Sequence, residues 1–419
     1  MHDIGVDSLI AQHHHLAGGL LVLLGLAFLL LAAHPFLTYP LSLRLLVRLR
    51  PRPLHMRPSL PMPRVALCVC AYNEEQVIAA KVANMLAMRA AVPDLEILVY
   101  VDAASDRTAT ILGGYADQIR LVVSPERHGK TYGMNTLVGM TEADLIVFSD
   151  ANVMFAADAV PRLLAPFADP DVGAVCGHLI YTGAGGNPTA ETGSRYWRLE
   201  ERIKALESAS GSVMGADGSI FAIRRRLHQP PPADLIDDMF VSLSVLCQGA
   251  RIVRAADAHA YEESVSRPGE EFRRKIRIAC QAFNVHRALV PSLRTLPLMD
   301  RYKYVSHKLL RWLTIYLLGA SAVSLLAGLA TMGAPSLARG LLAAGIAVIV
   351  AMMAIPIGPL AVLRDLLAAF LATGIGVWRS LRGARFQTWN PPASARGAMS
   401  PIAAGTWGTD TPVVAKDAR

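Results

Sequence analysis

The chain has 419 residues, of which 53% are apolar and only 18% are charged, and its formal net charge is +8. This length allows more than one domain, and the low charged fraction indicates membrane segments. Basic residues are densest at Arg44–Arg64 and Arg379–Arg385, beside apolar runs, which favours membrane lipids and argues against a nucleic-acid partner. Five scattered cysteines without a zinc spacing argue against a zinc site and are typical of a reducing compartment.

The N-terminal part of the sequence predicts a membrane anchor. A short tail at residues 1–15 precedes an apolar run at residues 16–37, which is long enough to cross a bilayer. A basic, proline-rich linker follows at residues 38–64. Because positive charges stay on the cytoplasmic side, we expect the tail outside the cell and the middle of the chain in the cytoplasm.

Residues 65–290 alternate short β-rich runs with helical patterns. The predicted strands are Val65–Cys70, Glu96–Val101, Ile119–Val123 and Leu145–Ser149. The predicted helices are Glu74–Met88, Asp106–Ala116, Lys130–Met140 and Asp158–Phe167. This alternation predicts an α/β domain with a mostly parallel, Rossmann-like sheet, which binds ligands beyond the carboxyl ends of its strands.

The C-terminal third returns to apolar sequence. A linker or interfacial helix is expected at 291–308, membrane spans at 309–332 and 341–357, a third span or interfacial helix at 360–378, and a tail at 379–419. Arg364 and Asp365 interrupt the last apolar run, and three arginines follow it. We therefore expect two spans, an interfacial segment and a cytoplasmic tail, which makes a multi-pass protein of the inner membrane.

Polar motifs follow three of the predicted strands. Tyr72-Asn73-Glu74 comes after the first strand and Asp102 after the second, where such groups can contact a nucleotide or cap a helix. Lys130 follows Gly129 at the start of a helical pattern, where a glycine lets backbone approach a phosphate. The phosphate-loop and dinucleotide glycine patterns are both absent from this sequence.

Asp150-Ala151-Asn152 ends the fourth predicted strand. In extended backbone, Asp150 and Asn152 face the same side, and their oxygens together with substrate phosphates suit Mg²⁺ or Mn²⁺. The alternative interpretation is an ordinary acidic turn. Asp237-Asp238 lies in an apolar, helical setting, where adjacent carboxylates repel and one of them can act as a general base. Its alternative is a helix N-terminus stabilised by acidic groups.

Glu271–Arg277 forms a basic helical stretch. It could hold a pyrophosphate or lie on anionic lipid, and a solvated charged face is the alternative.

Taken in order, these motifs resemble those of the family 2 glycosyltransferases, the inverting GT-A enzymes that include cellulose, chitin and hyaluronan synthases. The resemblance spans Pro63–Arg287. It implies that Tyr72, Glu74 and Asp102 contact the nucleotide and that Lys130 lies beside it. Asp150 and Asn152 would hold the metal and diphosphate, with Arg274 and Arg277 assisting. The acceptor side would correspond to Gly215 and Asp217, and the general base to Asp238 of the Asp237-Asp238 pair.

Two departures from the family pattern bear on function. The metal motif reads D-A-N, so that Asn152 offers a neutral ligand. The processive synthases carry Q-x-x-R-W, whereas this chain reads Arg274-Lys275-Ile276-Arg277-Ile278 and lacks the tryptophan that stacks on an acceptor sugar. Trp197 and Phe283 are candidate substitutes for it. The sequence therefore favours addition of one or a few sugars.

The function expected from the resemblance is transfer of a hexosyl group from a nucleotide-sugar, expected to be a UDP-sugar, to a lipid-linked or glycan acceptor in glycolipid or cell-surface polysaccharide synthesis. A processive polysaccharide synthase is one alternative. A non-catalytic nucleotide-binding scaffold is another, which the D-A-N change favours and the intact Asp237-Asp238 pair opposes.

Overall fold

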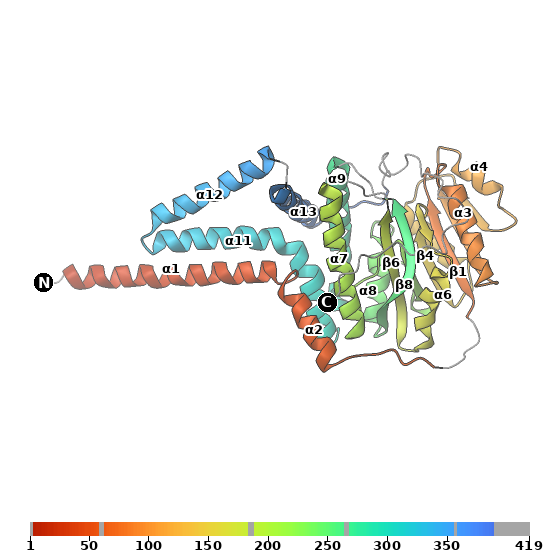
Figure 1. Cartoon of the computed structure of the whole chain (residues 1–419), viewed down its shortest axis with the longest axis horizontal. Helices are drawn as coiled ribbons and strands as arrows, with labels where there is room; N and C mark the ends of the chain where they lie inside the picture. Colours follow the sequence, from red (N-terminus) through yellow and green to blue (C-terminus); the bar gives the residue numbers. More distant parts are fainter. Residues whose placement is uncertain (1–2, 58–62, 183–187, 264–267, 356–357, 389–419) are drawn as a thin grey trace.

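The protein consists of a helical part and an α/β domain (Figure 1). The computed structural model describes residues 3–57, 63–182, 188–263, 268–355 and 358–388. Helices α1 (Asp3–Ala33), α11 (Leu310–Thr331) and α12 (Pro335–Ala354) extend together away from the domain. Helix α2 (Thr38–Leu49) leads from the helical part into the domain.

A single sheet forms the centre of the domain. Its strands, in chain order, are β1 (Val65–Ala71), β2 (Glu96–Asp102), β3 (Arg120–Ser124), β4 (Leu145–Asp150), β5 (Val153–Phe155), β6 (Val172–Thr182), β7 (Ile220–Arg224) and β8 (Arg251–Glu263). Their spatial order is β3-β2-β1-β4-β7-β6-β8-β5. The first four in this order are parallel neighbours, and antiparallel β7 joins them to the remaining strands. The predicted α/β architecture is confirmed.

Helices cover both faces of the sheet. They are α3 (Ile78–Ala87), α4 (Thr108–Gly113), α5 (Lys130–Gly139), α6 (Ala159–Leu164), α7 (Pro188–Ala209), α8 (Asp237–Cys247) and α9 (Pro268–Leu293), with short 3₁₀ turns at Met88–Ala90, Ala165–Ala168 and Arg225–Leu227. One buried core lies between the sheet and α3, α4 and α6, and a second lies between the sheet and α5, α8 and α9. Strands covered on both faces read as continuous apolar runs, as β1 and β4 do.

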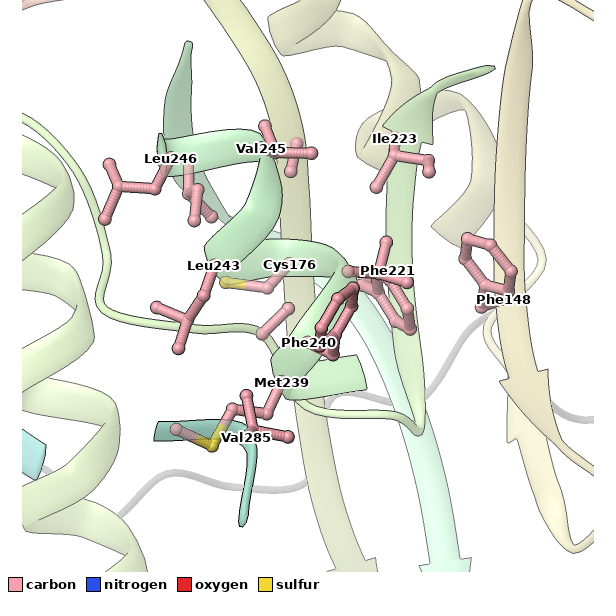
Figure 2. Packing of buried hydrophobic residues seen from close by; sticks show 14 of the residues in the cluster. Phe148, Cys176, Phe221, Ile223, Met239, Phe240, Leu243, Val245, Leu246 and Val285 are labelled. Atoms are coloured by element: carbon pink, nitrogen blue, oxygen red, sulfur yellow. The ribbon is translucent and has the colours of Figure 1, made fainter. Parts of the chain in front are cut away.

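The second core fixes the position of α8, whose first residues are the paired aspartates. Figure 2 shows Phe240 and Val245 of α8 on the side of β6 and β7, with Phe221 of β7 and Phe148 of β4 beyond them. The rings of Phe148 and Phe221 stack with centroids 4.6 Å apart. This packing holds the N-terminus of α8 next to the carboxyl end of β4.

The predicted elements differ from the observed ones mainly at helix starts. Each predicted strand lies within one residue of β1, β2, β3 or β4. Helices α3 and α4 begin later than predicted because the loop after β1 forms hydrogen bonds with the loop after β2. The Glu74 amide donates to Thr108 Oγ1 (2.7 Å), and the Glu75 amide donates to Asp106 Oδ2 (3.1 Å). Strands β5, β6, β7 and β8 were not predicted.

Four helices in the described part of the chain are long and apolar enough to cross a membrane: Gln12–Ala33, Leu298–Thr331, Pro335–Ala354 and Gly358–Leu381. The second of these comprises α10 (Leu298–Tyr304), a π-helical turn (Val305–Leu309) and α11. The fourth is α13 (Gly358–Leu381), whose interfacial or spanning placement stays a prediction. The backbone of α13 approaches α9 closely, since a Cβ added at Gly376 would lie 2.6 Å from the Ile276 carbonyl oxygen.

Small residues let α1 and α11 pack closely. A Cβ added at Gly328 would lie 2.8 Å from the Gly18 carbonyl oxygen, and the Ser321 hydroxyl donates to the Gly25 carbonyl oxygen at 2.8 Å. Close backbone approach through glycine and serine is typical of helix pairs in membranes.

A buried polar network joins the helical part to the domain. His307, in the π-helical turn, contacts Glu207 through Nδ1 (2.7 Å) and Glu200 through Nε2 (3.0 Å). Both glutamates lie on α7, and Glu207 also accepts a hydrogen bond from the Tyr39 hydroxyl of α2 at 2.5 Å. The second carboxylate oxygen of Glu207 accepts from the Met214 amide at 3.1 Å, at the start of the loop that carries Gly215 and Asp217. We refer to this set as the junction network.

The packing of α5 on the sheet gives a test of the fold. A Cβ added at Gly133 would lie 2.5 Å from Tyr100 Cδ1 and 2.7 Å from Cys70 Sγ. We expect Gly133→Ala to destabilise the protein by about 1–3 kcal/mol, because the buried side chains must shift to admit a methyl group. The measurement is the thermal unfolding midpoint of the purified protein in detergent.

Gly139→Ala on the same helix is the matched control. An added Cβ there meets nothing within 4 Å, so its midpoint should equal or slightly exceed that of the unsubstituted protein. Equal midpoints for the two variants would contradict the packing described for Gly133.

Candidate active site

A cavity of about 820 Å³ lies at the carboxyl ends of β1, β2 and β4. Nearly all the candidate site residues line it: Tyr72, Glu74, Asp102, Lys130, Asp150, Asn152, Asp217, Asp237, Asp238, Arg274 and Arg277. Gly215 is not part of the lining, although its loop reaches the cavity at Asp217 and Gly218. The cavity therefore gathers candidate residues that are up to 205 positions apart in the sequence, from Tyr72 to Arg277.

Asp102, at the end of β2, organises the loop that leads into α5. Its carboxylate accepts hydrogen bonds from the backbone amides of His128 (2.7 Å) and Gly129 (3.0 Å). Gly129 has a φ of +88°, which only glycine adopts readily, and Lys130 follows as the first residue of α5. Asp102 thus fixes the turn that places Lys130 in the cavity.

Tyr72 and Arg127 form a stacked pair beside this turn. The Arg127 guanidinium lies 3.5 Å from the centroid of the Tyr72 ring, and its Nε lies 3.7 Å from Asp102. A ring and a guanidinium arranged in this way offer a flat surface that suits a nucleotide base. The importance of Arg127 was not predicted from the sequence, because nothing in its local pattern indicates the contact with Tyr72.

Lys130 lies among carboxylates from two other elements. Its Nζ is 2.7 Å from Asp150 Oδ1, at the end of β4, and 3.3 Å from Asp237 Oδ2, at the start of α8. Burial opposes the charged form of the lysine, but Asp150 and Asp237 outweigh it, and together they raise the pKa of the ammonium well above its usual value. Lys130 is therefore a fixed positive charge at the centre of the cavity.

Asp238 is the second residue of α8 and faces the same region. Its Oδ2 accepts a hydrogen bond from the Gly218 amide at 2.8 Å, and its Oδ1 accepts one from the Met239 amide at 2.6 Å. Burial, followed by repulsion from Asp237, raises the pKa of Asp238 to about 7. A carboxyl group with such a pKa can take up and release a proton near neutral pH.

The D-A-N turn between β4 and β5 is held from behind by Lys81, a residue not singled out in the sequence. Lys81 is fully buried, and its Nζ donates to Ser149 Oγ (2.8 Å) and to the Val153 carbonyl oxygen (2.5 Å). Burial lowers the pKa of this lysine to about 7. Asp150 and Asn152 are thereby presented on a rigid turn.

The donors for a divalent cation in this cavity are few. Asp150 and Asn152 provide a carboxylate and an amide oxygen, and Glu262 lies against Asn152. Within the described ranges, no group of three or more His, Cys, Asp or Glu residues is placed to hold a metal ion. These hard oxygen donors fit Mg²⁺ or Mn²⁺ only where other oxygen ligands, such as phosphates or water, complete the coordination.

Two arginines of α9 line the side of the cavity opposite the strand ends. Arg274 lies 3.6 Å from Glu271 and interacts electrostatically with Tyr181 and Glu262. Arg277 donates to Gln281 Oε1 at 3.2 Å, and burial, together with the neighbouring Arg274, lowers its pKa to about 10. Both remain cationic at neutral pH, so they can bind a diphosphate.

Aromatic and charged groups of α7 form the wall near Asp217. Asp217 pairs with Lys204, which also contacts Glu201 at 3.0 Å. The Lys204 ammonium lies 4.9 Å from the centroid of the Trp197 ring, and Trp197 lines the cavity. Phe283, the other candidate aromatic residue, is instead buried in the core beside Trp312.

The residues that follow α13 also reach the cavity, although they were expected to form only a tail. Gln387 Nε2 donates to the His128 carbonyl oxygen at 3.0 Å, and the Phe386 carbonyl oxygen accepts from Gln281 Nε2 at 2.8 Å. Arg385 pairs with Asp234, just before α8. No motif in this segment indicated that it would return from the helical part to the domain.

Comparison with known proteins gives a consistent result for the domain. Residues 66–229 match the family described as Glycosyl transferase family 2. An N-acetylglucosaminyltransferase from Rhizobium leguminosarum bv. viciae is 26% identical over 259 residues, which are 58% of this chain and 60% of the relative. The O-antigen chain rhamnosyltransferase WbaN from Salmonella anatum is 27% identical over 190 residues, which are 42% of this chain and 59% of the relative. The chain thus spans less than two thirds of these relatives.

A solved structure shares the fold over most of the chain. The mannosyltransferase PcManGT from Pyrobaculum calidifontis, in complex with GDP-Man and Mn²⁺, superposes with a TM-score of 0.67 at 22% identity, and the match covers 86% of this chain and 99% of that chain. Together with the sheet order, this likeness shows that the domain has the GT-A fold, and the family match is to the family 2 glycosyltransferases over residues 66–229.

Proposed function

We propose that this protein is an inverting glycosyltransferase that moves a sugar from a nucleotide-sugar, expected to be a UDP-sugar, to a lipid-linked or glycan acceptor at the membrane. The observation that carries the proposal is that Asp238, whose pKa is raised to about 7, shares one cavity with Lys130 and the D-A-N turn. The names of the relatives, an N-acetylglucosaminyltransferase and a rhamnosyltransferase, support a sugar-transfer reaction.

The proposed donor site lies along the carboxyl ends of β1, β2 and β4. The base would lie by Tyr72, Glu74 and Arg127, with Asp102 fixing the loop beneath it. The diphosphate would be held by Lys130 and by Arg274 and Arg277 of α9. A divalent cation at Asp150 and Asn152, when bound, would offset charge on the departing diphosphate, and Mn²⁺ accompanies the nucleotide-sugar in the complex of PcManGT.

The proposed reaction is a single displacement. Asp238 takes the proton from an acceptor hydroxyl, whose oxygen forms a bond to the anomeric carbon while the bond from that carbon to the diphosphate breaks. Attack from the face opposite the leaving group inverts the anomeric configuration. Lys130 and the α9 arginines stabilise the negative charge that develops on the nucleoside diphosphate.

We further propose that the domain lies on the cytoplasmic side of the inner membrane. Arginines are concentrated between α1 and β1 and again after α13, which the positive-inside rule places in the cytoplasm. Nucleotide-sugars are cytoplasmic metabolites, so the donor would reach the cavity from the cytoplasm. A lipid-linked acceptor would reach it from the membrane. Cysteine labelling of the domain in intact cells tests this orientation.

Processive synthesis is the second candidate. It is favoured by Trp197, an aromatic residue in the cavity wall near Asp217 that could stack on an acceptor sugar. Ile278 also lines the cavity, at the place where the processive synthases carry tryptophan, and it offers no flat ring. The two candidates differ in product length, which mass spectrometry measures after incubation with a panel of nucleotide-sugars.

Asp102→Asn is expected to weaken binding of a nucleoside diphosphate about tenfold or more, because one charge-assisted hydrogen bond to the 128–129 amides is lost and Lys130 is less well placed. Isothermal titration with UDP and GDP measures the effect. Asp117→Asn is the control, since Asp117 is exposed and lies outside the cavity lining. Unchanged affinity in Asp102→Asn would contradict the role given to Asp102.

Asp238→Asn is expected to lower the rate of sugar transfer about 10²- to 10⁴-fold, because the amide cannot accept a proton from the acceptor. Binding of the nucleoside diphosphate should remain close to that of the unsubstituted enzyme. The exposed Asp257→Asn, on β8, serves as the control. A turnover in Asp238→Asn equal to that of the control would remove Asp238 from the mechanism.

The pH dependence follows from the same residue. Because the pKa of Asp238 is raised to about 7, the carboxylate that acts as base predominates only above that pH. The value of kcat/KM should therefore rise by one log unit per pH unit below about pH 7 and level off above it. A profile that stays flat from about pH 5.5 to about pH 8.5 would show that another group takes the proton.

A further inference from the structure

Glu262 is a buried carboxylate that lies beside the D-A-N turn and has no role so far. Strands β5 and β8 are antiparallel neighbours, and their register pairs Val153 with Glu262. This pairing brings Glu262 next to Asn152, whose Nδ2 donates to Glu262 Oε1 at 3.1 Å. The residue is only 8% exposed, yet it lines the same cavity as Asp150.

The contact determines which way the Asn152 amide faces. An ionised carboxylate only accepts hydrogen bonds, so it can contact the amide only through the NH₂ group. The amide oxygen of Asn152 therefore faces away from Glu262 and can coordinate a cation. Loss of a carboxylate that orients a ligand in this way typically lowers metal affinity about 10- to 100-fold.

Glu262 also compensates for the low negative charge of the D-A-N turn. Asp150 is the only acidic side chain of the D-A-N motif, and its Oδ1 is already paired with Lys130. A divalent cation would then meet little negative charge from the protein at Asn152. Glu262 supplies one negative charge at this place, on a strand that is remote in sequence from the motif.

We propose that Glu262 provides the second negative charge of the cation and diphosphate site, in place of the second acid of a D-x-D motif. The inference rests on the proposed function, because it assumes that a divalent cation binds at Asp150 and Asn152. A purely structural role is the competing explanation, since Arg274 of α9 also interacts electrostatically with Glu262 and the pair could simply anchor α9.

The test measures Mn²⁺ binding to the full-length enzyme in detergent, in the presence of UDP or GDP, by the loss of the free-ion signal in electron paramagnetic resonance. Glu262→Gln is expected to weaken Mn²⁺ binding about 10- to 100-fold. Adding Asn152→Asp to Glu262→Gln should restore the affinity towards that of the unsubstituted enzyme, because the new carboxylate at position 152 replaces the lost negative charge of its neighbour in space. Glu263→Gln is the matched control, since Glu263 is the exposed next residue of β8.

Glu262→Asp keeps the negative charge and should retain most of the Mn²⁺ affinity. This variant serves as a control in case Glu262→Gln fails to fold. Thermal melts of every variant show whether each is folded. Unchanged Mn²⁺ affinity in folded Glu262→Gln, or no recovery in the double variant, would overturn the inference while leaving the proposed function intact. If the unsubstituted enzyme binds no Mn²⁺ with either nucleotide, the cation site itself fails, and the inference fails with it.

Discussion

The cavity depends on the ion pairs that the Lys130 ammonium group makes with the surrounding carboxylates. Lys130 begins α5, Asp150 ends β4 and Asp237 begins α8, so their contacts tie three elements together at one point. Without the lysine, Asp150 and the Asp237-Asp238 pair would repel one another in a buried place. The surrounding chain is adapted to this cluster, since a Cβ at Gly218 would lie 3.0 Å from Asp238 Oδ2 and 3.2 Å from Lys130 Nζ.

The two halves of the sheet contribute different parts of the site. The parallel strands β1, β2 and β4 bring the groups of the proposed donor site to one edge, as the geometry of parallel sheets requires. The other half, which follows antiparallel β7, brings Glu262 on β8 to the same edge and connects to α9 with its arginines. The residues of the proposed donor site and the charged groups around them therefore come from segments that lie far apart in the sequence.

Much of the donor half could be predicted from sequence. Continuous apolar runs followed at once by polar residues indicate buried parallel strands, and Tyr72, Asp102 and Asp150 all stand at such ends. The Asp237-Asp238 pair also stood out as adjacent carboxylates, and the family resemblance added the choice of Asp238 as the base and the loop of Gly215 and Asp217. Among the later strands, β8 escaped prediction because it contains residues such as Arg254 and Asp257 and lacks a continuous apolar run.

Contacts between distant segments could not be predicted in the same way. The stacking of Arg127 on Tyr72, the pairing of Glu262 with Asn152 and the return of Gln387 to His128 depend on register and on the path of α13. A single sequence carries no signal for such pairings, because each partner is an ordinary polar residue in its own neighbourhood. The helix starts were misplaced for a related reason, since Thr108 and Asp106 bind the neighbouring loop.

The junction network bears on how the protein can be divided. Glu200 and Glu207 belong to the α/β domain, yet their partners His307 and Tyr39 belong to the helical part. An α/β domain excised from its helices would expose Glu200 and Glu207 to water and leave them without His307 and Tyr39, so the contacts that hold this face of α7 would be lost. Glu207 also anchors the Met214 amide, so the damage would begin at the loop that leads to the cavity. Removing the helices to gain solubility would therefore weaken the support of the loop that reaches the cavity at Asp217 and Gly218.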